Sequence, residues 1–363
     1  MKSIAVFFGG ESPEREISVI TGALALNSLD KTKFVPVPVY VDETGKWFTG
    51  DALFNIDNYK SLDRKKLKNT ALLPDGALYV IKGKKLKELC RPAAAINCMH
   101  GGAGENGSFS GLIEACGVPL ASPSVLPSAV AMDKEATKIF LKGARVPCLP
   151  YAVFKSADCS AADLPFGFPV IVKPACGGSS IGINRANDIE ELSAALLYAL
   201  KFGGKALVEP FAEDFTEINC AAYRARNGEI IVSACEKPVK KDEILSFADK
   251  YEGGTHVFPA DIEPKIAEKI QKTTASVYEK SGFSGIVRID FMVINGKVFV
   301  NEINSVPGSL AYYLFCNTLK GFSSLLTELI AVAEEKSKTE RLFVKRFDSG
   351  ILSVAGAKGA KRG

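Results

Sequence analysis

Oxygen-bearing side chains alternate along two neighbouring segments in the C-terminal third of the chain. Arg288 and Asp290 stand two residues apart, and Glu302 and Asn304 do so after an Asn-Gly turn. In a hairpin, residues two apart share a face, so these four side chains are expected on adjacent strands. Carboxylate and amide oxygens suit Mg²⁺ beside nucleotide phosphates, and an arginine there could stabilise a developing anion. The polar outer face of an ordinary hairpin shows the same alternation, so both interpretations stand.

A second candidate is the small-residue loop that follows an apolar strand. The chain reads Lys-Pro-Ala-Cys-Gly-Gly-Ser-Ser from 173 to 180. Such a loop lets backbone N–H groups approach phosphate oxygens, and its lysine supplies positive charge. The spacing is not that of a P-loop, and a flap without a ligand is the alternative.

The third candidate is Gly-Gly-Glu-Ser-Pro-Glu-Arg-Glu at positions 9–16, between a strand and a helical pattern. The helix dipole favours acidic residues in a first turn, so a tight turn without a ligand explains this pattern equally. The spacing is not Gly-x-Gly-x-x-Gly, which argues against a dinucleotide fingerprint.

The elements that must position these residues follow from hydrophobic periodicity. Strand, Gly-rich turn and helix recur in residues 1–122, which predicts a parallel α/β sheet. Residues 42–92 are Lys-rich and weakly periodic, and we expect them to form a surface insertion. Small residues and prolines around 119–127 indicate a domain boundary.

The remainder is expected to form two further units, 123–208 and 209–340, followed by a basic tail at 341–363. Their predicted elements are helices at 133–143, 188–201, 263–281 and 321–335 and hairpins at 217–233 and 286–303. A polar loop at 242–260 is long enough to be functional or disordered.

Composition excludes several classes of protein. The 363 residues are 47% apolar, and 45 basic against 41 acidic residues give a charge of only +4, which argues against a nucleic-acid binder. No run of 18 uncharged apolar residues exists, so no membrane span is expected. Nine scattered cysteines without C-x-x-C spacing argue against structural zinc and favour a reduced, cytoplasmic protein.

Taken together, the motifs resemble those of the ATP-grasp enzymes and, within them, the D-alanine–D-alanine ligase family. The resemblance runs from Ile4 to about Leu314 and rests on eight motifs in the family's order. Besides the three candidates above, they include Met-His-Gly-Gly-x-Gly-Glu-x-Gly at 99–107, Met-Asp-Lys at 132–134, Asp-Lys-Tyr at 249–251 and Asn-Glu-Ile-Asn-x-x-Pro-Gly at 301–308. The implied fold is an N-terminal parallel α/β (pre-ATP-grasp) domain followed by a two-part ATP-grasp fold.

The resemblance implies that ATP phosphorylates the carboxylate of one D-alanine and that the amine of a second displaces phosphate, for peptidoglycan synthesis. It implies that Glu14, Ser179, Tyr251 and Arg288 are catalytic, the first three as a triad that ties down the 242–260 lid. The implied substrate-binding residues are His100, Gly308, Tyr313 and Leu314.

The implied ATP-binding residues are Lys134, Ile171, Lys173, Ser180, Glu209, Phe211, Ala212, Glu217, Lys250 and Met292. Of these, Ile171, Phe211 and Met292 would serve equally as core residues. Asp290, Glu302 and Asn304 would hold two Mg²⁺ ions, with Mn²⁺ as a substitute. Family members commonly form dimers, so a homodimer is a candidate assembly, although no residue here indicates one.

Two departures from the family pattern bear on this reading. Tyr313 stands where typical members have a serine that helps bind the second substrate, and the spacing before Glu217 is shifted by one residue. A ligase of the same mechanism with another acceptor, such as D-serine or a hydroxy acid, is therefore an alternative. A nucleotide-binding protein that has lost catalysis is another, although the retained charged residues argue against it.

Overall fold

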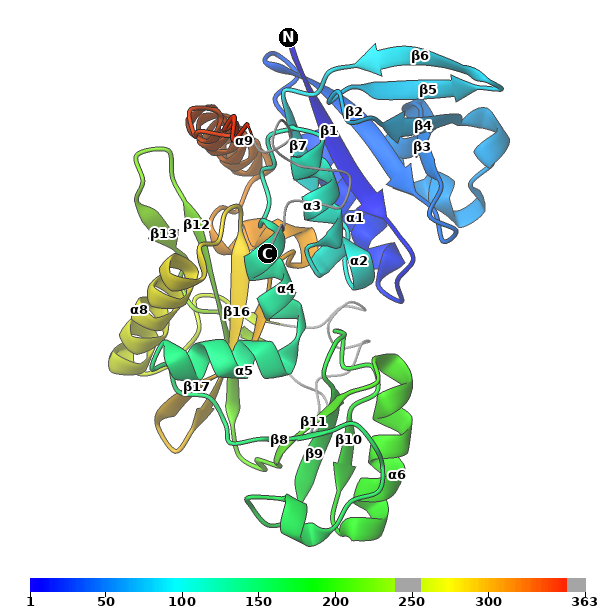
Figure 1. Ribbon diagram of the computed structural model, residues 1–363. Helices are drawn as coiled ribbons and strands as arrows, with labels where there is room; N and C mark the ends of the chain where they lie inside the picture. Colours follow the sequence, from blue (N-terminus) through cyan, green and yellow to red (C-terminus); the bar gives the residue numbers. More distant parts are fainter. Residues whose placement is uncertain (239–255, 351–363) are drawn as a thin grey trace.

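The computed structural model describes residues 1–238 and 256–350. That part of the chain forms a seven-stranded sheet, two four-stranded sheets and a two-stranded ribbon (Figure 1). None of the helices within these two ranges is long and apolar enough to cross a membrane. The predicted residues Lys250 and Tyr251, most of the lid and the end of the tail lie outside the described residues.

The N-terminal sheet is built around β1 (Lys2–Gly9), which pairs in parallel with β2 (Phe34–Val41) and β7 (Ala94–Asn97). This arrangement confirms the predicted parallel α/β core. Helix α1 (Arg15–Ser28) packs on β1, and the shorter α2 (Gly102–Glu105) and α3 (Ser108–Ala115) follow β7. Both Gly-rich turns of this sheet therefore lie at the carboxyl ends of adjacent parallel strands, where ligand sites form in such sheets.

The expectation that residues 42–92 form a surface insertion is wrong in one respect, because they extend the same sheet. Their strands are β3 (Trp47–Thr49), β4 (Lys68–Leu72), β5 (Leu78–Lys82) and β6 (Lys85–Cys90). Leu72, Leu78 and Val80 are buried, whereas almost all of β6 is exposed. The strands are short and antiparallel, and lysines on the solvent face hide their alternation.

The middle of the chain forms a small antiparallel sheet with the order β10-β9-β11-β8. Its strands are β8 (Ala152–Phe154), β9 (Val170–Pro174), β10 (Asn184–Ala186) and β11 (Ala206–Pro210). Helix α6 (Ile189–Ala199) covers one face and completes a separate apolar core (Figure 1). The loop between β9 and β10 contains the small-residue motif.

The third sheet has the order β13-β12-β16-β17 and contains both predicted hairpins. Its strands are β12 (Thr216–Arg224), β13 (Ile230–Val232), β16 (Val287–Ile294) and β17 (Lys297–Asn304). Helices α4 (Val125–Met132), α5 (Lys134–Gly143) and α8 (Pro264–Ser281) pack against this sheet. Helix α4 was not predicted from the sequence. The ribbon pairs β14 (Lys237–Pro238) with β15 (His256–Val257).

The last helix returns to the N-terminal sheet. Helix α9 (Leu319–Arg341) is longer than predicted, and its Phe322 and Leu326 share one core with Ile4 and Val6 of β1 (Figure 1). The turn η6 (Gly308–Leu314), which joins β17 to α9, packs against α1. The end of the third sheet is therefore fixed to the N-terminal domain. The domain limits at 122, 208 and 340 stay predictions.

Candidate active site

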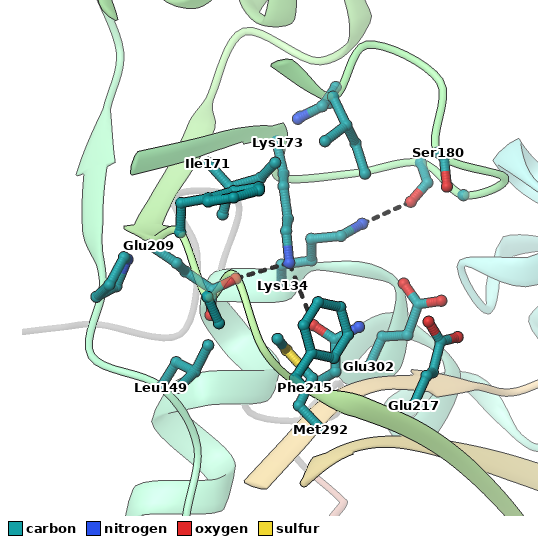
Figure 2. A pocket seen from close by; sticks show the side chains of 18 of the residues that line it. Lys134, Leu149, Ile171, Lys173, Ser180, Glu209, Phe215, Glu217, Met292 and Glu302 are labelled. Carbon is teal, nitrogen blue, oxygen red and sulfur yellow. Dashed lines mark hydrogen bonds and ion pairs between the residues drawn. The ribbon is translucent and has the colours of Figure 1, made fainter. Parts of the chain in front are cut away.

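A cavity with about 870 Å³ of empty space lies between the middle sheet and the third sheet (Figure 2). Nine of the ten residues predicted to bind ATP line it: Lys134, Ile171, Lys173, Ser180, Glu209, Phe211, Ala212, Glu217 and Met292. The motifs that suggested a nucleotide site, although far apart in sequence, thus meet in one place.

The cavity also contains residues that the motifs did not reveal. The apolar ones are Leu149, Ile181, Ile183, Pro210 and Phe215. Their residue types are those of an ordinary core, so only their position identifies them. Phe211 carries the guanidinium of Arg185 at 4.4 Å from the ring centroid, which leaves less of the ring for a base.

Asn301 was missed for a specific reason. Strict alternation places it on the face opposite Glu302, but β17 bulges where Asp290 pairs with Glu302 and Phe291 pairs with Val300. A bulge inserts one unpaired residue and redirects the side chains beside it. As a result Asn301 and Glu302 both line the cavity.

Buried charge is concentrated on Glu209, at the inner end of the cavity. Its carboxylate forms an ion pair with Lys138, and its Oε2 lies 2.8 Å from Nζ of Lys173. The side chains of Lys138 and Glu209 are only 2% and 1% exposed. Burial alone would raise the pKa of Glu209, but the two ammonium groups outweigh it and hold this pKa below its ordinary value.

Lys138 is a second residue that sequence reasoning missed. It follows Lys134 by four positions on α5, so both lie on the same face of that helix. This spacing was the available signal. Lys173 also donates to Oδ1 of Asn301 at 3.2 Å, which connects the middle sheet to the third sheet.

The small-residue loop closes the other end of the cavity. The backbone N–H of Lys134 donates to Ala175 at 2.8 Å, and its Nζ donates to the carbonyl of Gly177 at 2.7 Å. Ser179 and Ser180 have φ of 52° and 59°, a left-handed turn that side chains seldom adopt. Strain of this kind is common at ligand clamps.

Ser179 reaches from this loop to the N-terminal domain. Its hydroxyl donates a hydrogen bond to Oε1 of Glu14, and both residues are buried. A Cβ on Gly178 would lie 3.0 Å from Glu14, so the close approach favours glycine there. Two members of the predicted triad therefore meet, and the third, Tyr251, lies outside the described residues.

The predicted metal-binding residues lie at neighbouring positions on the paired strands β16 and β17. Asp290 pairs with Glu302, and Arg288 pairs with Asn304. Both carboxylate oxygens of Asp290 accept from Arg288, at 2.7 and 2.9 Å, and Oδ2 also accepts from Asn304 at 3.0 Å. Two carboxylates and an amide form a donor set of the type that Mg²⁺ prefers. A smaller cavity joins Glu302 and Asn304 to Glu14.

Arg288 interacts with the Asp290 carboxylate and with the phenol of Tyr313. Burial opposes the charge of Arg288, but the Asp290 carboxylate reverses that effect and holds the pKa of Arg288 well above its ordinary value. Burial raises the pKa of Tyr313 to about 12, although Arg288 lowers it in part. The phenol therefore stays protonated at neutral pH and can donate a hydrogen bond. The side chain of Leu314 is buried in the N-terminal core, so only its backbone could face a substrate.

His100 is buried rather than exposed to a cavity. Its Nε2 lies 2.9 Å from Oγ1 of Thr21, and burial lowers the pKa of His100 to about 4, which a hydrogen bond to the Val306 backbone offsets only in part. The ring is therefore neutral at physiological pH. Its contact with a substrate carboxylate stays a prediction. Such a contact would require His100 to give up its hydrogen bond with Thr21 or with the Val306 backbone.

Glu105 completes the smaller cavity and was assigned no role from sequence. Its Oε1 accepts the N–H of Val306 at 3.2 Å, and its Oε2 accepts the N–H of Gly101 at 3.0 Å. Burial, with Glu14 nearby, raises the pKa of Glu105 to about 7. The signal was its place in the Gly-rich motif at 99–107.

Comparisons with known proteins agree with this geometry. A family model described as "D-ala D-ala ligase N-terminus" matches residues 3–123, and one described as "D-ala D-ala ligase C-terminus" matches residues 140–331. A D-alanine–D-alanine ligase of Thermosipho melanesiensis is 33% identical over 98% of this chain and 99% of its own length. One from Helicobacter pylori strain J99 is 32% identical over 96% of this chain and 98% of its own.

Solved structures give the same result. The VanG D-Ala:D-Ser ligase of Enterococcus faecalis has a TM-score of 0.78 and 25% identity, covering 92% of this chain and 99% of its own. The D-alanine–D-alanine ligase of Helicobacter pylori has a TM-score of 0.76 and 28% identity, covering 91% and 98%. The predicted pre-ATP-grasp domain followed by an ATP-grasp fold is confirmed, and the chain belongs to the D-alanine–D-alanine ligase family.

Proposed function

We propose that this chain joins two D-alanines to D-Ala-D-Ala with conversion of ATP to ADP and phosphate, for peptidoglycan precursor synthesis. The observation that carries the proposal is that the lysine-lined cavity adjoins a smaller cavity lined by Glu14, Glu302 and Asn304, so that residues from all three parts of the fold meet. Family membership supports the ligase activity and the use of ATP.

ATP would enter the large cavity with its base between Ile171 and Met292 and its ribose at Glu217. Glu209 would accept from the exocyclic amine of adenine, and Lys134 and Lys173 would bind phosphate oxygens. Binding releases Lys173 from part of its contact with Glu209, whose charge Lys138 still balances. The buried carboxylate therefore remains ionised throughout.

The first D-alanine would place its ammonium at Glu14, which Ser179 orients. A carboxylate oxygen of this substrate attacks the γ-phosphorus of ATP, and ADP departs. The product is an acyl phosphate, whose carbonyl carbon is then open to attack. Asp290, Glu302 and Asn304 would hold Mg²⁺, which offsets the charge of the transferring phosphoryl group when bound.

The second D-alanine would bind beside Tyr313 and attack that carbon through its amine, which loses a proton. Arg288 and the N–H of Gly308 would stabilise the oxyanion of the tetrahedral intermediate. Phosphate leaves as the amide forms. Tyr313 motivates the alternative of a different acceptor, but the names of the curated relatives favour D-alanine.

Two further assignments belong to this proposal. All nine cysteines are free, which supports a reducing compartment such as the cytoplasm. A homodimer, which the resemblance implies, stays a prediction.

Phosphate release measured with Mg-ATP, with and without D-alanine, tests the proposal when the product is identified by mass. We expect release to require D-alanine and to yield the dipeptide, also in an equimolar mixture with D-serine. Release without D-alanine would overturn the ligase assignment. A product that is mainly D-Ala-D-Ser would show that D-serine, and not D-alanine, is the preferred acceptor.

A further inference from the structure

The turn that joins β17 to α9 has a strained backbone. Ser309, Leu310 and Ala311 have φ of 51°, 52° and 46°, in the left-handed region. Side chains crowd the following carbonyl there, so successive non-glycine residues persist only where the surroundings hold them. This turn begins at Gly308, whose N–H is proposed above to face the oxyanion. The contacts that hold it therefore bear on catalysis.

The first of these contacts comes from α1 of the N-terminal domain. Oγ1 of Thr21 accepts the N–H of Ser309 at 3.0 Å, from 288 positions earlier in the chain. The same oxygen lies 2.9 Å from Nε2 of His100. Thr21 is 1% exposed, so water has no access to replace either partner.

The proton positions of these groups are mutually consistent. Oγ1 of Thr21 accepts from Ser309, and its own proton is donated to Nε2 when a neutral His100 carries its single ring proton on Nδ1. The other ring nitrogen then carries the proton for the hydrogen bond with the Val306 backbone. One buried chain of hydrogen bonds thus runs from Ser309 through Thr21 and His100 back to Val306.

Glu105 holds the start of the turn independently. Its Oε1 accepts from Val306 at 3.2 Å, and its backbone carbonyl accepts from the hydroxyl of Ser305 at 3.2 Å. Val306, Leu310 and Ala311 pack in the core that contains β1 and α9. Polar and apolar contacts therefore both attach the turn to the N-terminal domain.

We propose that Thr21 and Glu105 are positioning residues that clamp the turn at Gly308 against the N-terminal domain and so aim its N–H. Neither residue contacts the reacting atoms, and both act through the backbone of 305–311. Gly308's catalytic role rests on the proposed function, but the clamp itself does not. Its tests therefore need one readout that is independent of activity.

The test compares Thr21→Val, which keeps the shape but loses the hydroxyl, with Thr21→Ser, which keeps the hydroxyl. Thr70→Val is the matched control, because Thr70 is also buried and donates to Tyr79 at 2.7 Å in the distant part of the sheet. Amide hydrogen exchange of Ser309 is measured in each. We expect at least tenfold faster exchange in Thr21→Val only.

Steady-state kinetics of the same variants give the second readout. In Thr21→Val we expect kcat/KM for D-alanine to fall at least tenfold while KM for ATP stays within twofold, and Thr21→Ser to restore the wild-type value. Unchanged Ser309 exchange and kinetics in Thr21→Val, or an equal loss of both in Thr21→Ser, would overturn the clamp. A changed exchange rate in a chain that makes no dipeptide would instead refute only the proposed function.

If Thr21→Val does not fold, Glu105→Gln tests the clamp instead. Glutamine replaces one acceptor oxygen by a donor, so the N–H of either Gly101 or Val306 loses its acceptor. Faster exchange of these amides with a loss of kcat/KM for D-alanine supports the clamp. Unchanged exchange and kinetics contradict it.

Discussion

The Ser179 hydroxyl donates to the Glu14 carboxylate across 165 positions of the chain, joining the loop of the middle sheet to the turn after β1. A hydrogen bond to a charged group contributes about 1.5–3 kcal/mol, so this one contact is a substantial restraint. It closes the small-residue loop over the carboxylate that is proposed to bind the first ammonium. The site therefore depends on how the two domains are held together.

Ser179→Ala should lower kcat/KM for D-alanine by about 10- to 100-fold, because 1.4 kcal/mol corresponds to a factor of ten. KM for ATP should change less, since Glu14 does not line the large cavity. Initial rates at varied D-alanine and ATP check this. Ser156→Ala, an exposed serine of the same domain, is the control. Equal losses for both substrates would contradict the assigned role.

Lys138→Met should raise KM for ATP about tenfold and leave KM for D-alanine within twofold. Without Lys138, Glu209 retains only Lys173, which then has to neutralise the buried carboxylate instead of binding phosphate. Isothermal titration with a non-hydrolysable ATP analogue measures the effect directly. Lys142→Met, which changes an exposed lysine near the end of the same helix, should bind as the wild type does.

Tyr313 should control the choice of acceptor. Its phenol lies beside Arg288, and Tyr313→Ser introduces the residue that typical members of the family have at this position. We expect the variant to form less D-Ala-D-Ser relative to D-Ala-D-Ala than the wild type in an equimolar mixture, by at least fivefold. Mass spectrometry of the products gives the ratio. An unchanged ratio would place the acceptor elsewhere.

His100 should make stability depend on pH. Its folded pKa of about 4 is below the unfolded value, so the unfolded chain binds more protons between these two values. The stabilisation is fully present above the unfolded pKa near 6.5 and is lost as pH falls through the folded pKa.

Between pH 7 and pH 5 this loss is about 2 kcal/mol. Urea unfolding at both values should therefore show a steeper decline for the wild type than for His100→Gln, which has no titrating ring. Parallel declines in the two proteins would show that the ring is not held neutral.

Most of the fold was predictable because its periodicities are strong. The buried run at Ile4–Phe8 and the two Asn-Gly hairpins gave correct elements, and α8 ends where Gly282 adopts a left-handed φ of 68°. The four strands within 42–92 were missed because each is short and because lysines in β4, β5 and β6 interrupt the apolar alternation. Helix α4 was missed because Pro127 within it and the prolines and small residues just before it indicated a boundary.

The site was predictable where motifs carry it and not where tertiary structure creates it. Lys173 and Glu302 were assigned from their motifs, whereas Asn301, although in the same motif as Glu302, faces the cavity only because β17 bulges there. Lys138, the ion-pair partner of Glu209, could not be distinguished from a surface lysine by sequence, because only the fold shows that it is buried. The role of Thr21 could not be predicted either, because its partners Ser309 and His100 are distant in sequence.

The most direct test of the account follows oxygen through the reaction. D-alanine labelled with ¹⁸O in its carboxylate is incubated with Mg-ATP, and phosphate and dipeptide are analysed by mass spectrometry. An acyl phosphate transfers one carboxylate oxygen to the departing phosphate, so we predict labelled phosphate in equal amount to D-Ala-D-Ala. Unlabelled phosphate, or labelled phosphate without dipeptide, would contradict ligation at this site.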